Sequence, residues 1–213
     1  MRELLKAKNK IAKSKKPWLI IISGVPATGK STLAIQLAAE LNWKIALGAD
    51  EIKAIMKKYD KNKYLRKSSH DAWKLLGEKN QKNILEGFRR YSLALKLGVE
   101  IVINKSKKTG ENLIIEGVHL IPSLYREVKG FNKLFVVVKS DFSRGHLSRI
   151  QNKVFERHSR QIDVWTDRME IFSIMENRFF KQRMNSKDLH IELSSTKKQI
   201  KKIINYIRNY EAI

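Results

Sequence analysis

The chain contains no cysteine, which excludes several kinds of chemistry at once. Without thiols there can be no disulfide bond, no cysteine nucleophile and no cysteine-ligated metal. Proline is almost as scarce, with three residues in 213, and no proline- or serine-rich stretch marks a linker between domains. We therefore expect one folded domain over residues 17–213, preceded by a basic tail at residues 1–16.

Long apolar runs are also missing from the sequence. None approaches the roughly 20 residues that a membrane-spanning helix needs. The charged first residues lack the apolar stretch of a secretory signal peptide. Hydrophobic residues still make up 42% of the chain, which is enough for a sizeable core. We expect a cytoplasmic protein without membrane attachment, and the composition leaves its oligomeric state undetermined.

Acidic residues are few relative to basic ones. The 44 lysines and arginines outnumber the 21 aspartates and glutamates, giving a formal net charge of +23. Such a field attracts polyanions and favours RNA binding through a basic surface, but it also suits a small-molecule anionic substrate. Because the charge is spread along the whole chain, a compositional bias explains it equally well. Residues 1–16 are accordingly a solvated tail, a short surface helix or a basic arm for RNA.

Residues 24–31 read G-V-P-A-T-G-K-S and fit the phosphate-loop pattern G-x-x-x-x-G-K-[ST] at every fixed position. The glycines let the backbone curl, so that its N–H groups converge on the phosphates of a nucleotide. Lys30 can reach the β- and γ-phosphates of ATP, and the Ser31 hydroxyl can hold Mg²⁺. The residues expected to bind the nucleotide are Gly24, Ala27, Thr28, Gly29, Lys30, Ser31 and Thr32.

The sequence around this loop supports the motif. Residues 18–23 form a short apolar run rich in isoleucine, which is typical of a buried parallel strand. Residues 32–41 carry leucine and alanine at helical spacing. The loop therefore connects a strand to a helix, and the phosphates would lie at the N-terminus of that helix.

The rest of the chain alternates between apolar runs and segments of helical periodicity. Further strands are expected at residues 44–50, 113–117, 134–138 and 189–193. Helices are expected at residues 51–59, 71–76, 80–97, 99–108 and 197–210, with a loop at 60–70 and Gly98 capping or bending the long helix. Residues 144–185 are mostly helical and arginine-rich. This alternation predicts an α/β protein with a parallel sheet.

Two carboxylates follow expected strands at the edge where ligands of parallel sheets bind. Glu116 directly follows three apolar residues, a position suited to assisting Mg²⁺. Asp50 is better placed to accept a proton from an attacking hydroxyl, or to position that hydroxyl. The structural alternatives are a helix N-cap for Asp50 and a strand-end salt bridge for Glu116.

Phosphoryl transfer also needs cations around the γ-phosphate and exclusion of water. Arginine suits this work because its planar guanidinium grips phosphate with two hydrogen bonds. Residues 144–185 would form a helical lid, and within it we expect Arg149 and Arg157 to act in catalysis. Arg144 and Arg160 are further candidates, although any of the four could be an ordinary exposed helix residue. His119 closely follows the third strand and could contact an acidic substrate.

Two longer strings carry a resemblance to a known family. Residues 65–73 contain Lys-Ser-Ser followed by Ala-Trp, and residues 110–122 contain Ile-Glu-Gly-Val-His-Leu-Ile-Pro. Together with residues 26–31 and 48–52, they resemble the archaeal 2-phosphoglycerate kinase family of P-loop kinases. The phosphate loop is shared by many kinases, whereas the two longer strings are much more specific.

The resemblance implies a P-loop kinase-like three-layer sandwich with a five-stranded parallel sheet in the order 2-3-1-4-5. It also implies transfer of the γ-phosphoryl group of ATP to 2-phosphoglycerate, giving 2,3-bisphosphoglycerate. The acceptor would be held by Lys67, Ser68 and Ser69, with Asp50 and His119 beside them. Two other functions stay open: a P-loop kinase that acts on RNA or tRNA, and a nucleotide-dependent switch without an acceptor.

Overall fold

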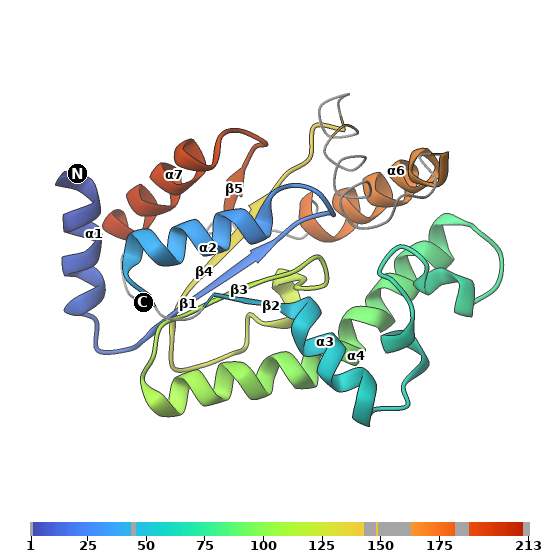
Figure 1. Ribbon diagram of the computed structural model, residues 1–213, viewed down its shortest axis with the longest axis horizontal. Helices are drawn as coiled ribbons and strands as arrows, with labels where there is room; N and C mark the ends of the chain where they lie inside the picture. Colours follow the sequence, from blue (N-terminus) through green and yellow to red (C-terminus); the bar gives the residue numbers. More distant parts are fainter. Residues whose placement is uncertain (1, 44–45, 143–147, 149–162, 182–187, 211–213) are drawn as a thin grey trace.

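The protein is built on a five-stranded parallel sheet, seen at the centre of the computed structural model (Figure 1). The structure describes residues 2–43, 46–142, 148, 163–181 and 188–210. The strands are β1 (Trp18–Ser23), β2 (Ala46–Gly48), β3 (Leu113–Glu116), β4 (Asn132–Val138) and β5 (Leu189–Ile191). They lie in the order β2-β3-β1-β4-β5, which confirms the predicted order and parallel direction.

Helices cover both faces of the sheet, giving three layers (Figure 1). On one face lie α1 (Arg2–Ala12), α2 (Lys30–Leu41) and α7 (Thr196–Asn209); on the other lie α3 (Ala49–Tyr59) and α4 (Gln81–Thr109). Strand β1 shows why. Ile20 and Ile22 pack in the core under α2 and α7, whereas Leu19 and Ile21 pack in the core with α3 and α4. An apolar run buried on both sides is what a central parallel strand requires.

A third core lies beside α4, where helix α6 (Asp163–Met175) packs and continues into a π-helical turn, η4 (Glu176–Lys181). Phe88 of α4 packs against the rings of Phe179 and Phe180, and Tyr91 and Phe172 belong to the same buried cluster. Part of the expected helical lid is thus helical, and its role as a lid stays a prediction. Arg144, Arg149, Arg157 and Arg160 lie outside the described residues.

Some local predictions were wrong. Gly98 does not cap a helix, because α4 continues through it to Thr109. The glycine allows close packing, since a Cβ there would press on Met56 and Ile52 of α3. The expected loop at residues 60–70 contains a 3₁₀ turn, η1 (Lys63–Arg66), and a second turn, η2 (Ala72–Leu75), replaces the α-helix expected at 71–76. Short 3₁₀ turns have no apolar period long enough to be recognised in a sequence.

Helix α1 within the basic N-terminal segment is docked on the domain (Figure 1). Its Ala7 is fully buried in the core beside α7, and Lys10 Nζ donates a hydrogen bond to the carbonyl oxygen of Arg208 at 3.2 Å. Glu3 forms an ion pair with the Arg208 guanidinium. Among the described residues, no helix is long and apolar enough to cross a lipid bilayer.

We expect Ala7→Glu to lower the melting temperature by at least about 5 °C, since burying a carboxylate costs several kcal/mol unless the helix detaches. Asn9→Glu adds the same charge at an exposed position of α1 and should shift stability by less than about 0.5 kcal/mol. Thermal unfolding followed by circular dichroism measures both. Equal melting temperatures for the two variants would show that α1 is not docked in solution.

Candidate active site

The site is built where the central strand ends. Strand β1 leads into residues 24–29, and α2 starts at Lys30. In the sheet register, Ile22 of β1 pairs with Glu116 of β3, and Gly48 of β2 pairs with the same glutamate. The ends of three neighbouring strands therefore lie level. The phosphate loop (residues 24–31), Glu116 and the start of α3 converge at this edge.

The backbone of the phosphate loop has the curl that the motif predicts. Gly24 has φ 141°, and a Cβ there would collide with the carbonyl oxygen of Val138 on β4. Gly29 (φ 80°) and Ala27 (φ 60°) both lie in the left-handed region. When left-handed residues are interspersed in a loop, successive N–H groups turn toward one concave side. A concave surface of this kind can bind an anion. Ala27 adopts it at a conformational cost that glycine would not carry, and strain of this kind is typical of a binding loop.

The Lys30 side chain folds back over the loop. Its Nζ donates to the carbonyl oxygen of Val25 at 2.8 Å and approaches the Thr28 hydroxyl at 3.4 Å. Only 7% of the residue is exposed. The ammonium group is thus held within the curl where an anion would approach.

Ser31 and Glu116 meet at the expected metal position. The Ser31 hydroxyl donates a 2.8 Å hydrogen bond to Oε1 of Glu116, so the two side chains converge although 85 residues separate them. Hydroxyl and carboxylate oxygens are the hard ligands that Mg²⁺ prefers, and Mg²⁺ completes its shell with water and substrate phosphates. Among the described residues, no group of three or more histidine, aspartate or glutamate side chains is arranged to hold a metal ion. A hydroxyl and a carboxylate fit a magnesium ion whose other ligands come from water and a nucleotide.

Asp50 lies in the first turn of α3 and is exposed. The N-cap of this helix is Gly48, so the structural alternative of an N-cap role for Asp50 was wrong. Its negative charge acts on three neighbours: it opposes the effect of burial on the pKa values of Lys53 and His119, and it adds to the rise of the Tyr91 pKa that burial causes. Asp50 therefore faces the same region as these three side chains.

His119 is completely buried, with its ring against the edge of Tyr91 at a centroid distance of 5.5 Å. Burial lowers its pKa to about 4, and the positive charges of Lys53 and Lys30 act in the same direction. Neither ring nitrogen makes a hydrogen bond of good geometry within the described residues, although the backbone of Ala49 lies near enough to oppose part of the fall in pKa. The histidine is thus neutral at pH 7 and lies behind the site surface. Its predicted contact with the acceptor stays a prediction.

The predicted acceptor residues lie in residues 67–71, here called the acceptor segment. Lys53 Nζ of α3 donates to the carbonyl oxygen of Lys67 at 2.6 Å, which ties the segment to the helix that carries Asp50. The Ser68 hydroxyl donates to Oδ2 of Asp71 at 2.7 Å, and Ser69 is 8% exposed. The main chain of the segment therefore approaches the site, while the Ser68 hydroxyl is bonded within the segment.

The acceptor segment also contacts α6. The His70 ring meets Phe172 edge-on at a centroid distance of 5.7 Å. Burial lowers the pKa of His70 to about 4, and the charge of Arg168 on α6 is the next largest cause. Arg168 is thus an arginine of the lid region near the acceptor segment, which the sequence analysis did not single out.

Sequence reasoning also missed Lys53 and Tyr91. A signal for Lys53 was available, since it follows Asp50 by three residues and must share its helix face. Tyr91 carried no such signal, because its apolar period on α4 is that of a core residue.

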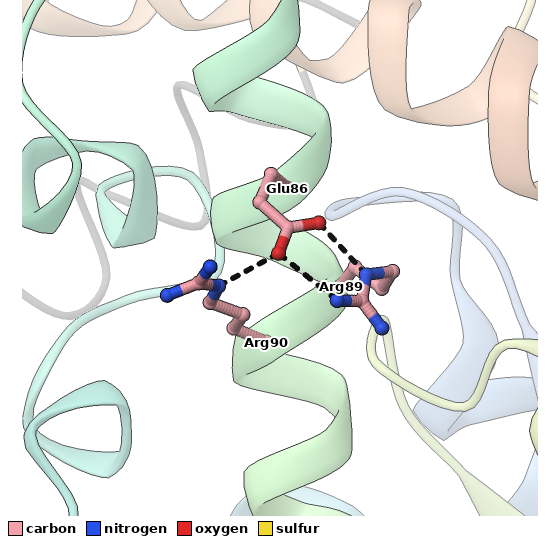
Figure 2. Close-up of polar contacts among 3 residues, drawn as sticks. All are labelled: Glu86, Arg89 and Arg90. Atoms are coloured by element: carbon pink, nitrogen blue, oxygen red, sulfur yellow. Dashed lines mark hydrogen bonds and ion pairs between the residues drawn. The ribbon is translucent and has the colours of Figure 1, made fainter.

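Two arginines on α4, Arg89 and Arg90, share one carboxylate, that of Glu86, as Figure 2 shows. Glu86 accepts hydrogen bonds from Arg89 at 2.8 and 2.9 Å and from Arg90 at 2.7 Å. These bonds lower the pKa of Glu86 to about 2. The cluster is exposed on one helix, so it is an intrahelical charge network, distinct from the convergence of elements at the phosphate loop.

Comparison with known proteins agrees with this geometry. The Zeta toxin family model matches residues 1–91. A 2-phosphoglycerate kinase of Methanocaldococcus jannaschii is 36% identical over 116 residues, which are 53% of this chain and 38% of that enzyme. A mevalonate-3-phosphate 5-kinase of Thermoplasma acidophilum is 27% identical over 141 residues, 66% of this chain and 70% of that enzyme. The match with the 2-phosphoglycerate kinase thus spans less than half of that relative's length.

Solved structures share the fold. A putative kinase from Chloroflexus aurantiacus has a TM-score of 0.54 at 17% identity, covering 93% of this chain and 100% of that chain. Shikimate kinase from Acinetobacter baumannii has a TM-score of 0.54 at 16% identity, covering 93% and 96%. The predicted P-loop kinase fold and the resemblance to archaeal 2-phosphoglycerate kinases are both confirmed.

The buried His119 makes stability depend on pH. Because its pKa in the folded protein lies below the usual 6.5, the unfolded chain takes up the proton first as the pH falls. The part of the free energy of unfolding that depends on neutral His119 is therefore fully present above about pH 6.5. It is lost as the pH falls to about 4, a change of about 3 kcal/mol. We expect His119→Gln to flatten the stability profile by about this amount.

Urea unfolding of both proteins at pH 7 and pH 4.5 measures the difference. His70 titrates in both and cancels in the comparison. Identical losses of stability on acidification would contradict a buried neutral His119.

Proposed function

We propose that this protein is an ATP- and Mg²⁺-dependent kinase that phosphorylates the hydroxyl group of a small phosphorylated acceptor, with 2-phosphoglycerate as the first candidate. The observation that carries the proposal is the meeting of the curled phosphate loop, the Ser31–Glu116 pair and Asp50 at the end of β1. A loop of this shape binds the phosphates of a nucleotide. A carboxylate nearby can accept the proton of an acceptor hydroxyl or orient that hydroxyl.

The nucleotide would be held mainly by the main chain. The N–H groups of the loop residues other than Pro26, together with those of the first turn of α2, would face a bound triphosphate. Lys30 exchanges its bond with the Val25 carbonyl for the β- and γ-phosphates. Thr28 is buried in the loop, and Thr32 is exposed at the start of α2, where its hydroxyl can reach a phosphate.

Magnesium would be held by Ser31 and Glu116, with the ion neutralising charge on the β- and γ-phosphates. In that state the hydroxyl turns its oxygen to the ion, and Glu116 accepts hydrogen bonds from water around the ion.

The acceptor would bind between Asp50 and the acceptor segment. Its hydroxyl oxygen forms a bond to the γ-phosphorus as the bond from that phosphorus to the β,γ-bridging oxygen breaks, and ADP leaves. Asp50 either accepts the hydroxyl proton or orients the hydroxyl while the proton passes to the transferred phosphate. We keep Arg149 and Arg157 as candidates for the charge of the transferred group, alongside the acceptor contacts proposed for Lys67, Ser68, Ser69 and His119.

Two relatives support a phosphorylated acceptor. One is named 2-phosphoglycerate kinase and the other mevalonate-3-phosphate 5-kinase, so both names specify an acceptor that already carries a phosphate. Both acceptors also carry a carboxylate and a free hydroxyl. The phosphate dianion of such an acceptor suits a site whose described cations include Lys30 and Lys53.

Turnover on a panel of acceptors tests the proposal. The protein is incubated with γ-labelled ATP and Mg²⁺ against 2-phosphoglycerate, 3-phosphoglycerate, mevalonate 3-phosphate, nucleosides and bulk tRNA. We expect label in 2,3-bisphosphoglycerate from 2-phosphoglycerate. Label in tRNA would favour the RNA-directed alternative, and nucleotide binding without transfer to any acceptor would favour a switch.

Lys30→Ala should lower kcat/KM by at least about 10²-fold, because a charged contact to the transferring phosphoryl group is lost. Lys108→Ala removes the same charge from an exposed position near the end of α4 and should leave turnover unchanged. Initial rates on the acceptor found above measure both. Full activity in the Lys30 variant would refute the phosphate-loop assignment.

Asp50→Asn should reduce kcat by about 10² to 10⁴-fold, the range for loss of a general base, with KM for ATP changed less than about threefold. Glu40→Gln removes one carboxylate from an exposed position of α2 and is the matched control. Steady-state kinetics with ATP and acceptor varied separately provide the measurement. If Asp50→Asn raised only the KM for ATP, Asp50 would belong to the nucleotide half of the site.

A further inference from the structure

Lys53 is one of the cations near the candidate acceptor site, but the reaction outlined above assigns it no contact with a particular group of the acceptor. It lies on α3, one turn after Asp50, and is half-buried. Its Nζ lies 2.6 Å from the carbonyl oxygen of Lys67 and 4.8 Å from the centroid of the Tyr91 ring on α4. A long, flexible side chain is thus fixed by two separate elements, at an entropic cost.

The charge of Lys53 reaches both halves of the candidate acceptor site. It acts on His119, which follows β3, and on His70 in the acceptor segment, since it lowers the pKa of each. Burial lowers the pKa of Lys53 itself, and the nearby Asp50 counteracts that effect. The ammonium group therefore lies between the catalytic carboxylate and the acceptor segment.

The contacts of Lys53 leave room for an anion. An ammonium group has three N–H donors. Within the described residues, the Lys67 carbonyl takes one donor and the face of the Tyr91 ring lies against the group. Neither partner carries a full negative charge, and Asp50 offsets only part of the effect of burial, so this half-buried cation is incompletely compensated. A phosphate dianion in reach of the third donor would supply that charge.

We propose that Lys53 binds the phosphate group that the acceptor already carries, and thereby directs the free hydroxyl of the acceptor toward Asp50. This inference rests on the proposed kinase function and names the residue that makes the acceptor site select phosphorylated molecules. The spacing supports the arrangement: Asp50 and Lys53 project from adjacent turns of one helix face, so one small molecule can contact both.

A purely structural role for Lys53 makes a different prediction. If the side chain only tied α3 to Lys67, its loss would change stability and leave the affinity for the acceptor unaffected. The relevant measurement is therefore the KM for the acceptor, compared with kcat and with the KM for ATP.

The first test uses Lys53→Met and Lys53→Arg, with Lys57→Met as control. Lys57 lies one turn further along α3, is exposed, and loses the same charge. We expect Lys53→Met to raise the KM for 2-phosphoglycerate at least about tenfold, the typical loss for one charged hydrogen bond, with KM for ATP within threefold of wild type. Lys53→Arg should recover most of the loss, and Lys57→Met should behave as wild type. An unchanged acceptor KM in Lys53→Met overturns the inference.

The second test uses the unaltered protein and needs no turnover. Lysines are labelled with trace acetic anhydride in the presence of ATP analogue and Mg²⁺, and the modification of Lys53 relative to Lys57 is read by mass spectrometry. We expect 2-phosphoglycerate and glycerol 2-phosphate to protect Lys53, and glycerate, which lacks the phosphate, to leave it reactive. Protection by glycerate and not by glycerol 2-phosphate would assign Lys53 to the carboxylate and overturn the phosphate proposal.

The two tests separate failure of this inference from failure of the proposed function. Protection of Lys53 without phosphoryl transfer would keep the anion site and refute the kinase activity. Transfer without protection would keep the kinase and refute the role of Lys53. Neither protection nor transfer would overturn both.

Discussion

The site depends on one backbone constraint, the tight turn that the chain makes between β1 and α2. Gly24 passes so close to the Val138 carbonyl that no side chain fits, so the start of the curl lies directly against β4. The hydrogen bond from Ser31 to Glu116 anchors its other end to β3. The loop is therefore clamped between both neighbours of the central strand. Its N–H groups are oriented before any ligand arrives, so little ordering is left for binding to accomplish.

The charged side chains of the candidate site form two pairs, each made of one cation and one carboxylate. Lys30 and Glu116 flank the expected triphosphate, while Lys53 and Asp50 flank the expected acceptor. The buried neutral His119 lies behind Lys53 and Asp50, and it is kept uncharged by its surroundings. In the proposed function, each substrate would meet one cation and one carboxylate. This distribution is local, and the net charge of +23 contributes a long-range field that is not needed to explain it.

The sequence predicted the parts of the structure that follow periodic or positional rules. The five strands, their parallel direction and the phosphate loop were all predictable, since apolar runs and a fixed motif specify them. The sheet order came from the resemblance of whole strings. The 3₁₀ turns around residues 60–76 and the passage of α4 through Gly98 were not predictable, because they depend on contacts between elements.

The site was predictable in its backbone and less so in its side chains. Ser31 at the start of α2 meets Glu116 at the end of β3, and Lys30 folds back over the loop, as the motif and the strand end predict. The burial of His119 and the hydrogen bond from Lys53 to the Lys67 carbonyl result from tertiary packing, which a sequence motif does not specify. The acceptor segment approaches the site partly through its main chain, whereas residue types had indicated its side chains.

The acceptor segment lies outside the sheet. It is fastened to α3 and α6 by a few discrete contacts, one through the Lys67 carbonyl and one through the His70 ring, while the nucleotide half is embedded in strand register. Under the proposed function, changes in this short connection would alter the preference for the acceptor without disturbing the phosphate loop. A scaffold divided in this way lets related chains diverge in what they phosphorylate while the phosphate donor stays the same.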